Sequence, residues 1–217
     1  MVLLFDVDGT LFLTDDPLFG RALVAATRDV CSVDLPPDAL SRLDHPGQTT
    51  LAIGRALGLA GDLRRWCATV AERYLELLAS ADASGWRAAE GAAGTLELLS
   101  RSARLALLTG NPEPVARARV ERLGLARFFP AGQGAFGCEA EPRPELIRLA
   151  LERAGETDAV AVGDTPADVA GARAAGIAVV AIASGRLARE ELDGADAVVS
   201  RLADLPAALA GLRRAPA

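Results

Sequence analysis

The sequence predicts an α/β protein with a doubly wound parallel sheet and an inserted all-helical segment. From residue 91 to the end, short apolar runs alternate with segments of helical spacing, a pattern typical of parallel strands joined by helices. One further apolar run stands alone at residues 2–5, and from about residue 17 to residue 80 only helical spacing is found. The first strand is therefore expected to be separated from the rest of the sheet by helices.

The N-terminal run at residues 2–5 is expected to be a buried strand because four β-prone residues end abruptly in Asp6 and Asp8. Helices are then expected at residues 17–31, in a short stretch opening at Pro36-Pro37-Asp38, from Thr49 or Thr50 to Leu57 with Gly58 ending it, and after Asp62.

The second half alternates regularly. We expect helices at 92–100, 113–123, 144–154 and from Thr165 to 175, and strands at 105–108, near Phe128-Phe129, and at 160–162, 177–182 and 197–199. This pattern assigns residues 1–14 and 87–217 to the sheet domain and residues 15–86 to the helical insert.

The composition excludes several classes of protein. The 217-residue chain has a net charge of −6 and only 4% aromatic residues, which argues against a nucleic-acid-binding face. No apolar run is long enough to cross a bilayer, and no basic segment precedes the first apolar run, so neither a membrane partner nor a secretory signal is expected. Cys31, Cys67 and Cys138 are too few and scattered for a disulfide framework. A reducing, cytoplasmic location is therefore expected.

Polar side chains follow three of the expected strands. Asp6 and Asp8 end the first, Thr109 ends the second, and Asp164 with Asp168 follows a third. Carboxyl ends of parallel strands share one edge, where ligands bind in open α/β sheets. Because crowded carboxylates repel one another unless a cation lies between them, the pattern predicts an oxygen-ligated metal ion at this edge.

Three features have simpler explanations. Asp-Gly pairs are common in turns, so the first motif alone could be an ordinary strand end. The glycines at 132–137 match a dinucleotide fingerprint, but Pro142 and Pro144 interrupt the segment after them, so a plain glycine-rich loop is expected. The single histidine, His45, either faces a ligand or lies exposed in a turn, and the turn is favoured.

Three motifs in order, residues 6–10 (DVDGT), 108–111 (LTGN) and 163–168 (GDTPAD), give the chain a clear resemblance. It resembles the haloacid dehalogenase-like hydrolase superfamily over its whole length, and within it the helical-cap, phosphoglycolate phosphatase-like members. The resemblance implies a Rossmann-like core whose cap domain is inserted after the first strand, where the helical segment 15–86 stands.

The resemblance also implies roles for the acidic residues. Asp6 would be the nucleophile that forms an aspartyl-phosphate, and Asp8 the general acid and then base. Mg²⁺ would bind Asp6, the backbone carbonyl of Asp8 and Asp164, with Asp168 as a water-linked partner.

Other residues would bind the transferring phosphoryl group. Thr109 and the backbone of Gly110 and Asn111 would hold its oxygens. The lysine of the family's Lys-Pro-x-Pro pattern is replaced here by Glu141, and the chain contains no lysine. Arg143, two residues on, is the expected replacement cation because a guanidinium also binds phosphate. Arg117 and Arg119 are alternatives whose positions fit a solvated helix face better.

The expected function is therefore Mg²⁺-dependent hydrolysis of a small phosphorylated metabolite by a monomer or homodimer. Asp8 favours a phosphatase over a dehalogenase because a phosphate ester needs its leaving group protonated. Two alternatives stay open: a phosphomutase of the same fold, and a catalytically idle binding or regulatory protein, which Glu141 in place of lysine would favour.

Overall fold

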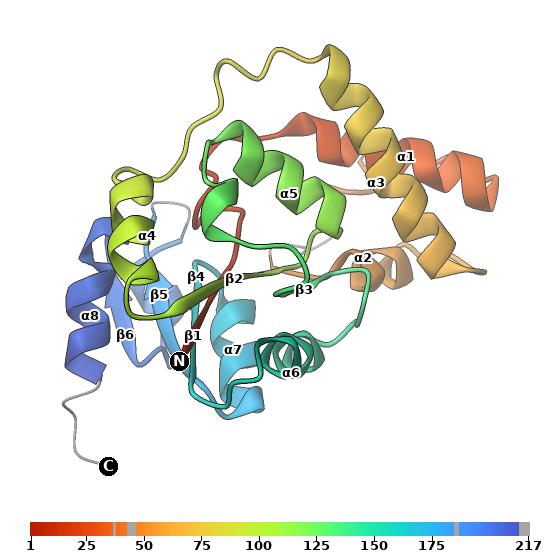
Figure 1. Cartoon of the computed structure of the whole chain (residues 1–217). Helices are drawn as coiled ribbons and strands as arrows, with labels where there is room; N and C mark the ends of the chain where they lie inside the picture. The colour runs from red at the N-terminus through yellow and green to blue at the C-terminus, as the bar shows by residue number, and fades with distance from the viewer. Residues whose placement is uncertain (37, 43–46, 185–186, 213–217) are drawn as a thin grey trace.

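A parallel six-stranded sheet forms the centre of the molecule (Figure 1). The computed structural model describes residues 1–36, 38–42, 47–184 and 187–212. The strand order is β3-β2-β1-β4-β5-β6, the doubly wound order in which a crevice opens beside β1. The strands are β1 (Val2–Phe5), β2 (Arg104–Thr109), β3 (Ala135–Phe136), β4 (Ala159–Gly163), β5 (Ala178–Ile182) and β6 (Ala197–Val199). The predicted α/β fold is confirmed.

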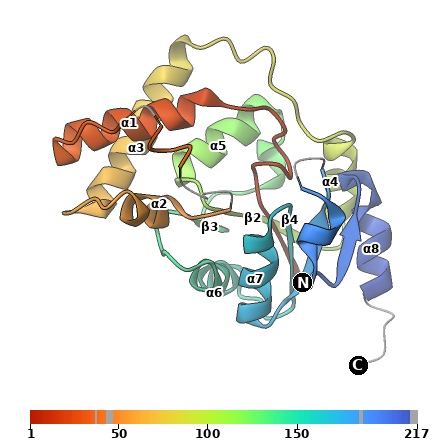
Figure 2. The same ribbon diagram turned by 180° about the vertical axis from the view of Figure 1, so that it is seen from behind.

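Helices cover both faces of this sheet, as the two opposite views show (Figures 1 and 2). Leu3 and Phe5 of β1 pack in a core with α4, α5 and α8, while Val2 and Leu4 pack in a second core with α6 and α7. The alternation along β1 therefore buries both of its faces. These helices are α4 (Ala92–Ser100), α5 (Glu113–Arg122), α6 (Arg143–Ala154), α7 (Pro166–Ala175) and α8 (Leu205–Leu212).

The helical insert, residues 15–86, follows β1 and precedes α4 in the chain, and its helices pack in a third hydrophobic cluster that also includes Val115 of α5. It contains α1 (Pro17–Cys31), α2 (Thr50–Ala56) and α3 (Leu63–Ser80). Trp66 is fully buried, and its indole N–H donates a hydrogen bond to Thr27 Oγ1 over 3.0 Å. Asp16, Thr49 and Asp62 cap the three helices as N-caps, so local capping fixes where each begins.

The insert is seated on the carboxyl edge of the sheet by backbone contacts. The N–H groups of Thr50 and Leu51 donate to the carbonyls of Gly110 and Gly137 over 2.9 and 3.0 Å. A β-carbon at Gly110 would overlap the carbonyl of Gln48, and one at Gly137 would overlap the Gly110 carbonyl. Glycine at both positions is what lets the first turn of α2 approach the strand ends so closely.

Three local predictions were wrong. Residues 38–42 form turns rather than the start of a helix, and Ala126–Phe128 is a 3₁₀ helix where a strand was expected at Phe128-Phe129. The strand lies instead at Ala135–Phe136, inside the expected glycine-rich loop, and pairs with Leu108 and Thr109. Two residues are too few to show a strand period. Pro37 and His45 lie outside the described residues.

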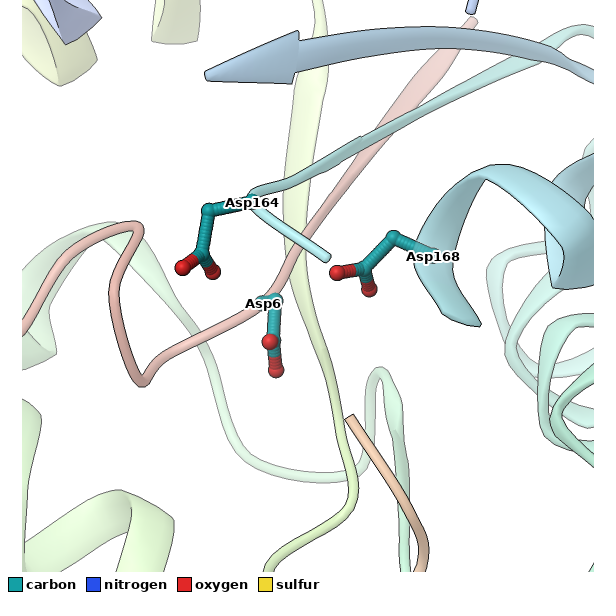
Figure 3. Close-up of side chains that lie close together, drawn as sticks. All are labelled: Asp6, Asp164 and Asp168. Atoms are coloured by element: carbon teal, nitrogen blue, oxygen red, sulfur yellow. The ribbon is translucent and has the colours of Figure 1, made fainter. Parts of the chain in front are cut away.

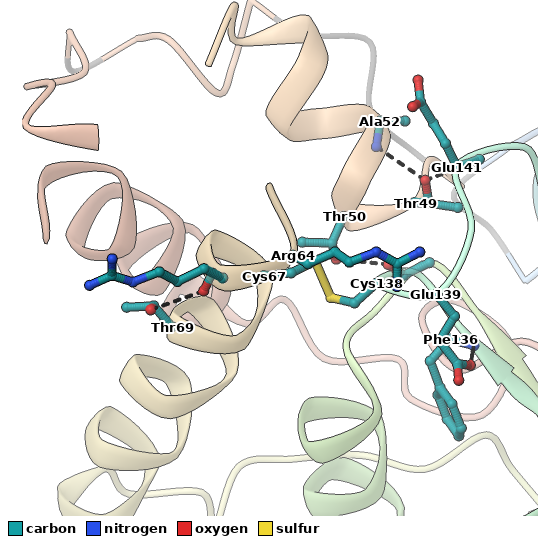
Figure 4. Close-up of a disulfide and its surroundings, with 12 residues drawn as sticks. Thr49, Thr50, Ala52, Arg64, Cys67, Thr69, Phe136, Cys138, Glu139 and Glu141 are labelled. Atoms are coloured by element: carbon teal, nitrogen blue, oxygen red, sulfur yellow. Dashed lines mark hydrogen bonds between the residues drawn. A yellow bond between two sulfur atoms is a disulfide. The ribbon is translucent and has the colours of Figure 1, made fainter. Parts of the chain in front are cut away.

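A disulfide joins the insert to the sheet domain, although the cysteines were expected not to form a disulfide framework. Cys67 of α3 is bonded to Cys138 in the loop after β3, with a Cα–Cα distance of 5.8 Å (Figure 4). The two cysteines lie 71 positions apart in the sequence and meet only because α3 packs over that loop. The sequence alone therefore did not reveal the pairing. Cysteine usage therefore gives no support to a reducing compartment, and the cytoplasmic location stays a prediction.

Breaking this crosslink should lower stability. Cys67→Ser is expected to reduce the free energy of unfolding by up to about 4 kcal/mol. Without the crosslink, the unfolded chain is no longer closed into a loop and gains conformational entropy. The measurement is urea unfolding under oxidising conditions, with Cys31→Ser, which alters a free cysteine among the described residues, as the control. The same loss should appear in the unsubstituted protein after reduction. Identical midpoints before and after reduction would contradict it.

Candidate active site

Three buried carboxylates meet at the carboxyl edge of the sheet. Asp6 follows β1, Asp164 follows β4, and Asp168 lies in the first turn of α7. Each offers an oxygen, and these oxygens all lie within 4.8 Å of one another. The close-up shows the three side chains gathered in one place (Figure 3). Asp6 and Asp164 thus converge as the three sequence motifs predicted, although 158 positions of chain separate Asp6 from Asp164.

This buried group carries more negative than positive charge, since among the described residues three acids lie beside the one guanidinium of Arg143. Burial, followed by the charge of Asp168, raises the pKa of Asp6 well above its usual value, while Arg143 lowers it only in part. Oxygen donors at this spacing with excess negative charge are the environment that hard divalent cations bind. The residues present therefore fit a divalent metal ion.

The loop after β1 is built around Asp164. The hydroxyl of Thr10 donates a hydrogen bond to Asp164 Oδ1 over 3.1 Å. Gly9 has a φ of 79°, and a β-carbon there would overlap the Asp164 carboxylate. The Asp-x-Asp-Gly-Thr pattern is thus explained locally, because glycine allows the turn and threonine orients the acid.

The carboxylate of Asp8 faces away from this acidic group and towards Arg119. One guanidinium nitrogen of Arg119 lies 2.7 and 2.8 Å from the two carboxylate oxygens of Asp8, and the side-chain amide of Asn111 also donates to Asp8. The Asp8 side chain is 35% exposed, towards a cavity at the strand ends. Coordination of a metal by the backbone carbonyl of Asp8 stays a prediction.

Thr109, Gly110 and Asn111 form the turn that ends β2. The Thr109 hydroxyl accepts a hydrogen bond from Asn111 Nδ2 over 3.1 Å, which fixes both side chains. The Gly110 carbonyl accepts from the hydroxyl of Thr50 over 2.8 Å, so this turn also carries the insert. All three residues line the same cavity as Asp6 and Asp8.

Arg143 lies beside Asp6 at the start of α6. A terminal guanidinium nitrogen is 3.4 Å from Asp6 Oδ1 and also bonds Asp168, while the other donates to the Gly47 carbonyl over 2.9 Å. Burial alone would lower its pKa, but the charges of Asp168 and Asp6 outweigh burial and raise it, so Arg143 stays protonated.

Glu141, which stands where the family has lysine, points away from Asp6. Its carboxylate pairs with Arg55 of the insert, and its backbone carbonyl accepts from the Thr49 hydroxyl over 2.9 Å (Figure 4). The guanidinium beside Asp6 is therefore that of Arg143, on the first residue of the next helix.

Asp168 has two functions in the local structure. Its Oδ2 accepts from the backbone N–H and the hydroxyl of Thr165 over 3.0 and 2.7 Å, which completes a capping box at the start of α7. Its other oxygen binds Arg143. Asp168 therefore fixes Arg143, and both carboxylate oxygens already accept hydrogen bonds, which suits an indirect metal partner better than a direct ligand.

Arg119 does not lie on a solvated helix face, contrary to the interpretation of the sequence. Its side chain is 3% exposed and contacts Asp8, Asn111, Asp16 and Tyr74. The signal was present in the sequence, because Arg119 shares the helical spacing of buried Val115, Ala116 and Val120 on α5. A basic residue on an apolar face is a reason to look for buried acids.

A cavity of about 460 Å³ lies between the strand ends and the insert. Its described lining includes Asp6, Asp8 and Thr109 from the sheet domain, and Phe19 and Leu40 from the insert. Its size suits a small organic ligand.

In the part of the chain that the structure describes, we find no helix with the length and apolarity needed to cross a membrane.

Known proteins share both the sequence and the fold. Residues 1–176 match the model of the family described as haloacid dehalogenase-like hydrolase. A phosphoglycolate phosphatase of Rhodospirillum rubrum is 35% identical over 201 residues, covering 84% of this chain and 79% of that protein.

Two solved structures show the same fold at low identity. CbbY from Rhodobacter sphaeroides, in complex with phosphate, aligns with a TM-score of 0.67 and 22% identity over 96% of this chain and 98% of that chain. A haloacid dehalogenase-like family hydrolase from Streptococcus pneumoniae aligns with a TM-score of 0.65 and 22% identity, over 96% and 97%. The chain therefore belongs to the haloacid dehalogenase-like hydrolase family, among its phosphoric monoester hydrolases.

Proposed function

We propose that this chain is a Mg²⁺-dependent phosphatase that hydrolyses a small, phosphoglycolate-like phosphorylated metabolite through an aspartyl-phosphate on Asp6. The observation that carries the proposal is the surroundings of Asp6. It is buried with two further acids, lies 3.4 Å from the guanidinium of Arg143, and opens onto a cavity that Asp8 also lines. A nucleophile, a cation and a second carboxylate thus share one small space.

The metal would be held by the carboxylates of Asp6 and Asp164 and by the backbone carbonyl of Asp8, with Asp168 linked through water. A divalent cation bound there would supply the positive charge that lets a carboxylate approach an anionic phosphate. The raised pKa of Asp6, caused first by burial and then by Asp168, supports this assignment, because a cation beside Asp6 would favour the ionised form that attacks phosphorus.

In the first step, an Asp6 oxygen attacks phosphorus and the bond to the leaving oxygen breaks. Arg143 neutralises charge on the nucleophile and the phosphoryl group, and its contacts with Asp168 and Gly47 hold it in place. The hydroxyl of Thr109 and the backbone of Gly110 and Asn111 bind the phosphoryl oxygens.

Asp8 protonates the leaving alcohol and then takes a proton from the water that hydrolyses the aspartyl-phosphate. Its hydrogen bonds with Asn111 and Arg119 direct its carboxylate to the wall of the cavity. A separate general acid is what a phosphate ester with a poor leaving group requires, and this supports a phosphatase.

The helical insert, residues 15–86, acts as a cap that closes over the substrate, with hinges near residues 12–17 and 82–90. Its contacts with Gly110 and Gly137 at the strand ends are those of a seated cap, and the cavity lies between the two parts. Closure would exclude water while the phosphoryl group is transferred. The cavity volume of about 460 Å³ favours a small metabolite over a polymer.

The test is release of inorganic phosphate from 2-phosphoglycolate by the purified protein, with Mg²⁺ and with EDTA. We expect turnover with Mg²⁺ and at least about 100-fold less after chelation. A parallel incubation with glucose 1-phosphate separates the alternatives, because a mutase yields the isomer and a phosphatase yields free sugar. A folded protein without metal-dependent turnover on any phosphate ester would support the idle, ligand-binding alternative and refute the proposal.

A further inference from the structure

Arg119 lies on α5 between the site and the helical insert, and its contacts on the site side hold the general acid. One terminal nitrogen donates to both oxygens of Asp8, over 2.7 and 2.8 Å, and to Asn111 Oδ1 over 3.1 Å. Asn111 donates in turn to Asp8, so the three side chains form a closed set of hydrogen bonds. The direction of the Asp8 carboxylate is therefore set by α5 as well as by the loop after β1.

The remaining nitrogens of Arg119 bind two residues of the insert. Its second terminal nitrogen lies 2.9 Å from Asp16, the N-cap of α1, and its Nε donates to the Tyr74 hydroxyl of α3 over 3.2 Å. The Tyr74 hydroxyl donates to the same Asp16 oxygen over 2.7 Å. The two insert residues thus bind each other as well as the guanidinium.

Aromatic rings confine the guanidinium further. Its central carbon lies 5.2 Å from the ring centre of Phe12, 5.5 Å from that of Phe19 and 5.3 Å from that of Tyr74. Five hydrogen bonds and three rings leave this side chain little freedom. A movement of the insert that displaced Asp16 or Tyr74 would therefore also displace Arg119 and the Asp8 carboxylate that it binds.

Charge makes this link costly to break. Burial acts to lower the pKa of Arg119, but the charges of Asp8 and Asp16 and the contacts with Tyr74 together outweigh burial and raise the pKa above its usual value, so the guanidinium stays charged. Asp16 is 3% exposed, and without Arg119 it would be a buried carboxylate beside Asp8 with its ion pair lost.

We propose that Arg119 is a positioning residue that aligns the Asp8 carboxyl with the leaving group and makes this alignment depend on seating of the helical insert through Asp16 and Tyr74. The inference rests on the proposed role of Asp8 as general acid. It gives the closed insert a second task besides excluding water: completing the geometry of proton transfer.

Leaving groups of different basicity distinguish positioning from a structural role. An alkyl phosphate such as 2-phosphoglycolate needs its leaving oxygen protonated, whereas p-nitrophenyl phosphate releases a stable anion and needs little help. Arg119→Met is expected to lower kcat/KM, which reports the step that expels the leaving group and not the later hydrolysis of the aspartyl-phosphate, by about 100-fold or more on 2-phosphoglycolate and by less than about tenfold on p-nitrophenyl phosphate. Tyr74→Phe, which removes one hydroxyl, should also lower activity selectively on 2-phosphoglycolate, but with a smaller loss.

Arg122→Met is the matched control, because Arg122 is exposed on the same helix and should leave both rates unchanged. Addition of methylguanidinium to Arg119→Ala should restore part of the 2-phosphoglycolate rate. Equal losses on both substrates in Arg119→Met, or in Tyr74→Phe if the arginine variant does not fold, would overturn the inference.

Asp8→Asn separates this inference from the proposed function. A selective loss on 2-phosphoglycolate in Asp8→Asn, without one in Arg119→Met, would reject the role of Arg119 and leave Asp8 as the acid. A non-selective loss in Asp8→Asn would reject both. Selective losses in both variants support the link.

Discussion

Asp6→Asn is expected to lower kcat by about 10⁴-fold or more, because an amide oxygen is too weak a nucleophile to form the phosphoryl-enzyme bond. The measurement is phosphate release from 2-phosphoglycolate at saturating Mg²⁺, with circular dichroism to show that the fold is retained. Leu13→Ala, at a partly exposed position outside the cavity lining, serves as a control for general disturbance of the loop after β1. Activity within tenfold of the unsubstituted protein would show that Asp6 is not the nucleophile.

The same substitution should stabilise the metal-free protein. The pKa of Asp6 in the folded state is raised, chiefly by burial, so folding favours the protonated form. Its contribution to stability is therefore present below the ordinary carboxyl pKa and is lost as the pH rises through the folded-state value. At neutral pH, Asp6→Asn removes the cost of burying an ionised carboxylate. The thermal unfolding midpoint of this variant in EDTA should therefore exceed that of the unsubstituted protein. Saturating Mg²⁺ should narrow the difference, because the cation compensates the ionised carboxylate.

Arg143→Met should lower kcat by about 10³-fold, since it removes the cation that offsets charge on Asp6 and on the phosphoryl group. The loss should fall on 2-phosphoglycolate and p-nitrophenyl phosphate alike, because charge on the transferring group develops with either leaving group. This uniform loss contrasts with the selective loss expected for Arg119→Met.

Arg143→Lys tests whether charge alone suffices. Lysine keeps the charge but cannot bond Asp6, Asp168 and the Gly47 carbonyl together. We therefore expect Arg143→Lys to lower kcat, but by less than Arg143→Met does. Arg148→Met, at an exposed position on the same helix, is the control and should retain full activity. An unchanged kcat in Arg143→Met would assign the cationic role to another residue.

The sequence predicted the parts of the site that strand ends determine. Asp6 and Asp164 meet because each ends a strand, β1 or β4, and these strands are neighbours in a parallel sheet. Arg143 was expected near Asp6 through a family pattern, and the structure gives the physical basis: α6 begins there, with Asp168 fixing the guanidinium.

The features that the sequence did not reveal depend on how the insert is seated. Arg119 was assigned to solvent because arginine is usually exposed, yet the acids that bury it lie on separate segments. β3 has two residues and no detectable period. The Cys67–Cys138 bond depends on a contact between α3 and a loop that only the folded chain creates. Each of these is set by tertiary contacts rather than by local pattern.

The bond between Cys67 and Cys138 turns residues 67–138 into a covalent ring. The segment from 81 to 91, which joins α3 to α4 across the outside of the molecule, lies within that ring and includes the exposed Arg87 (Figure 1). After cleavage by trypsin at Arg87, the nicked protein should therefore migrate as one species on a denaturing gel until a thiol is added. A cut before Cys67 or after Cys138 would give a separate fragment on the same gel without any thiol.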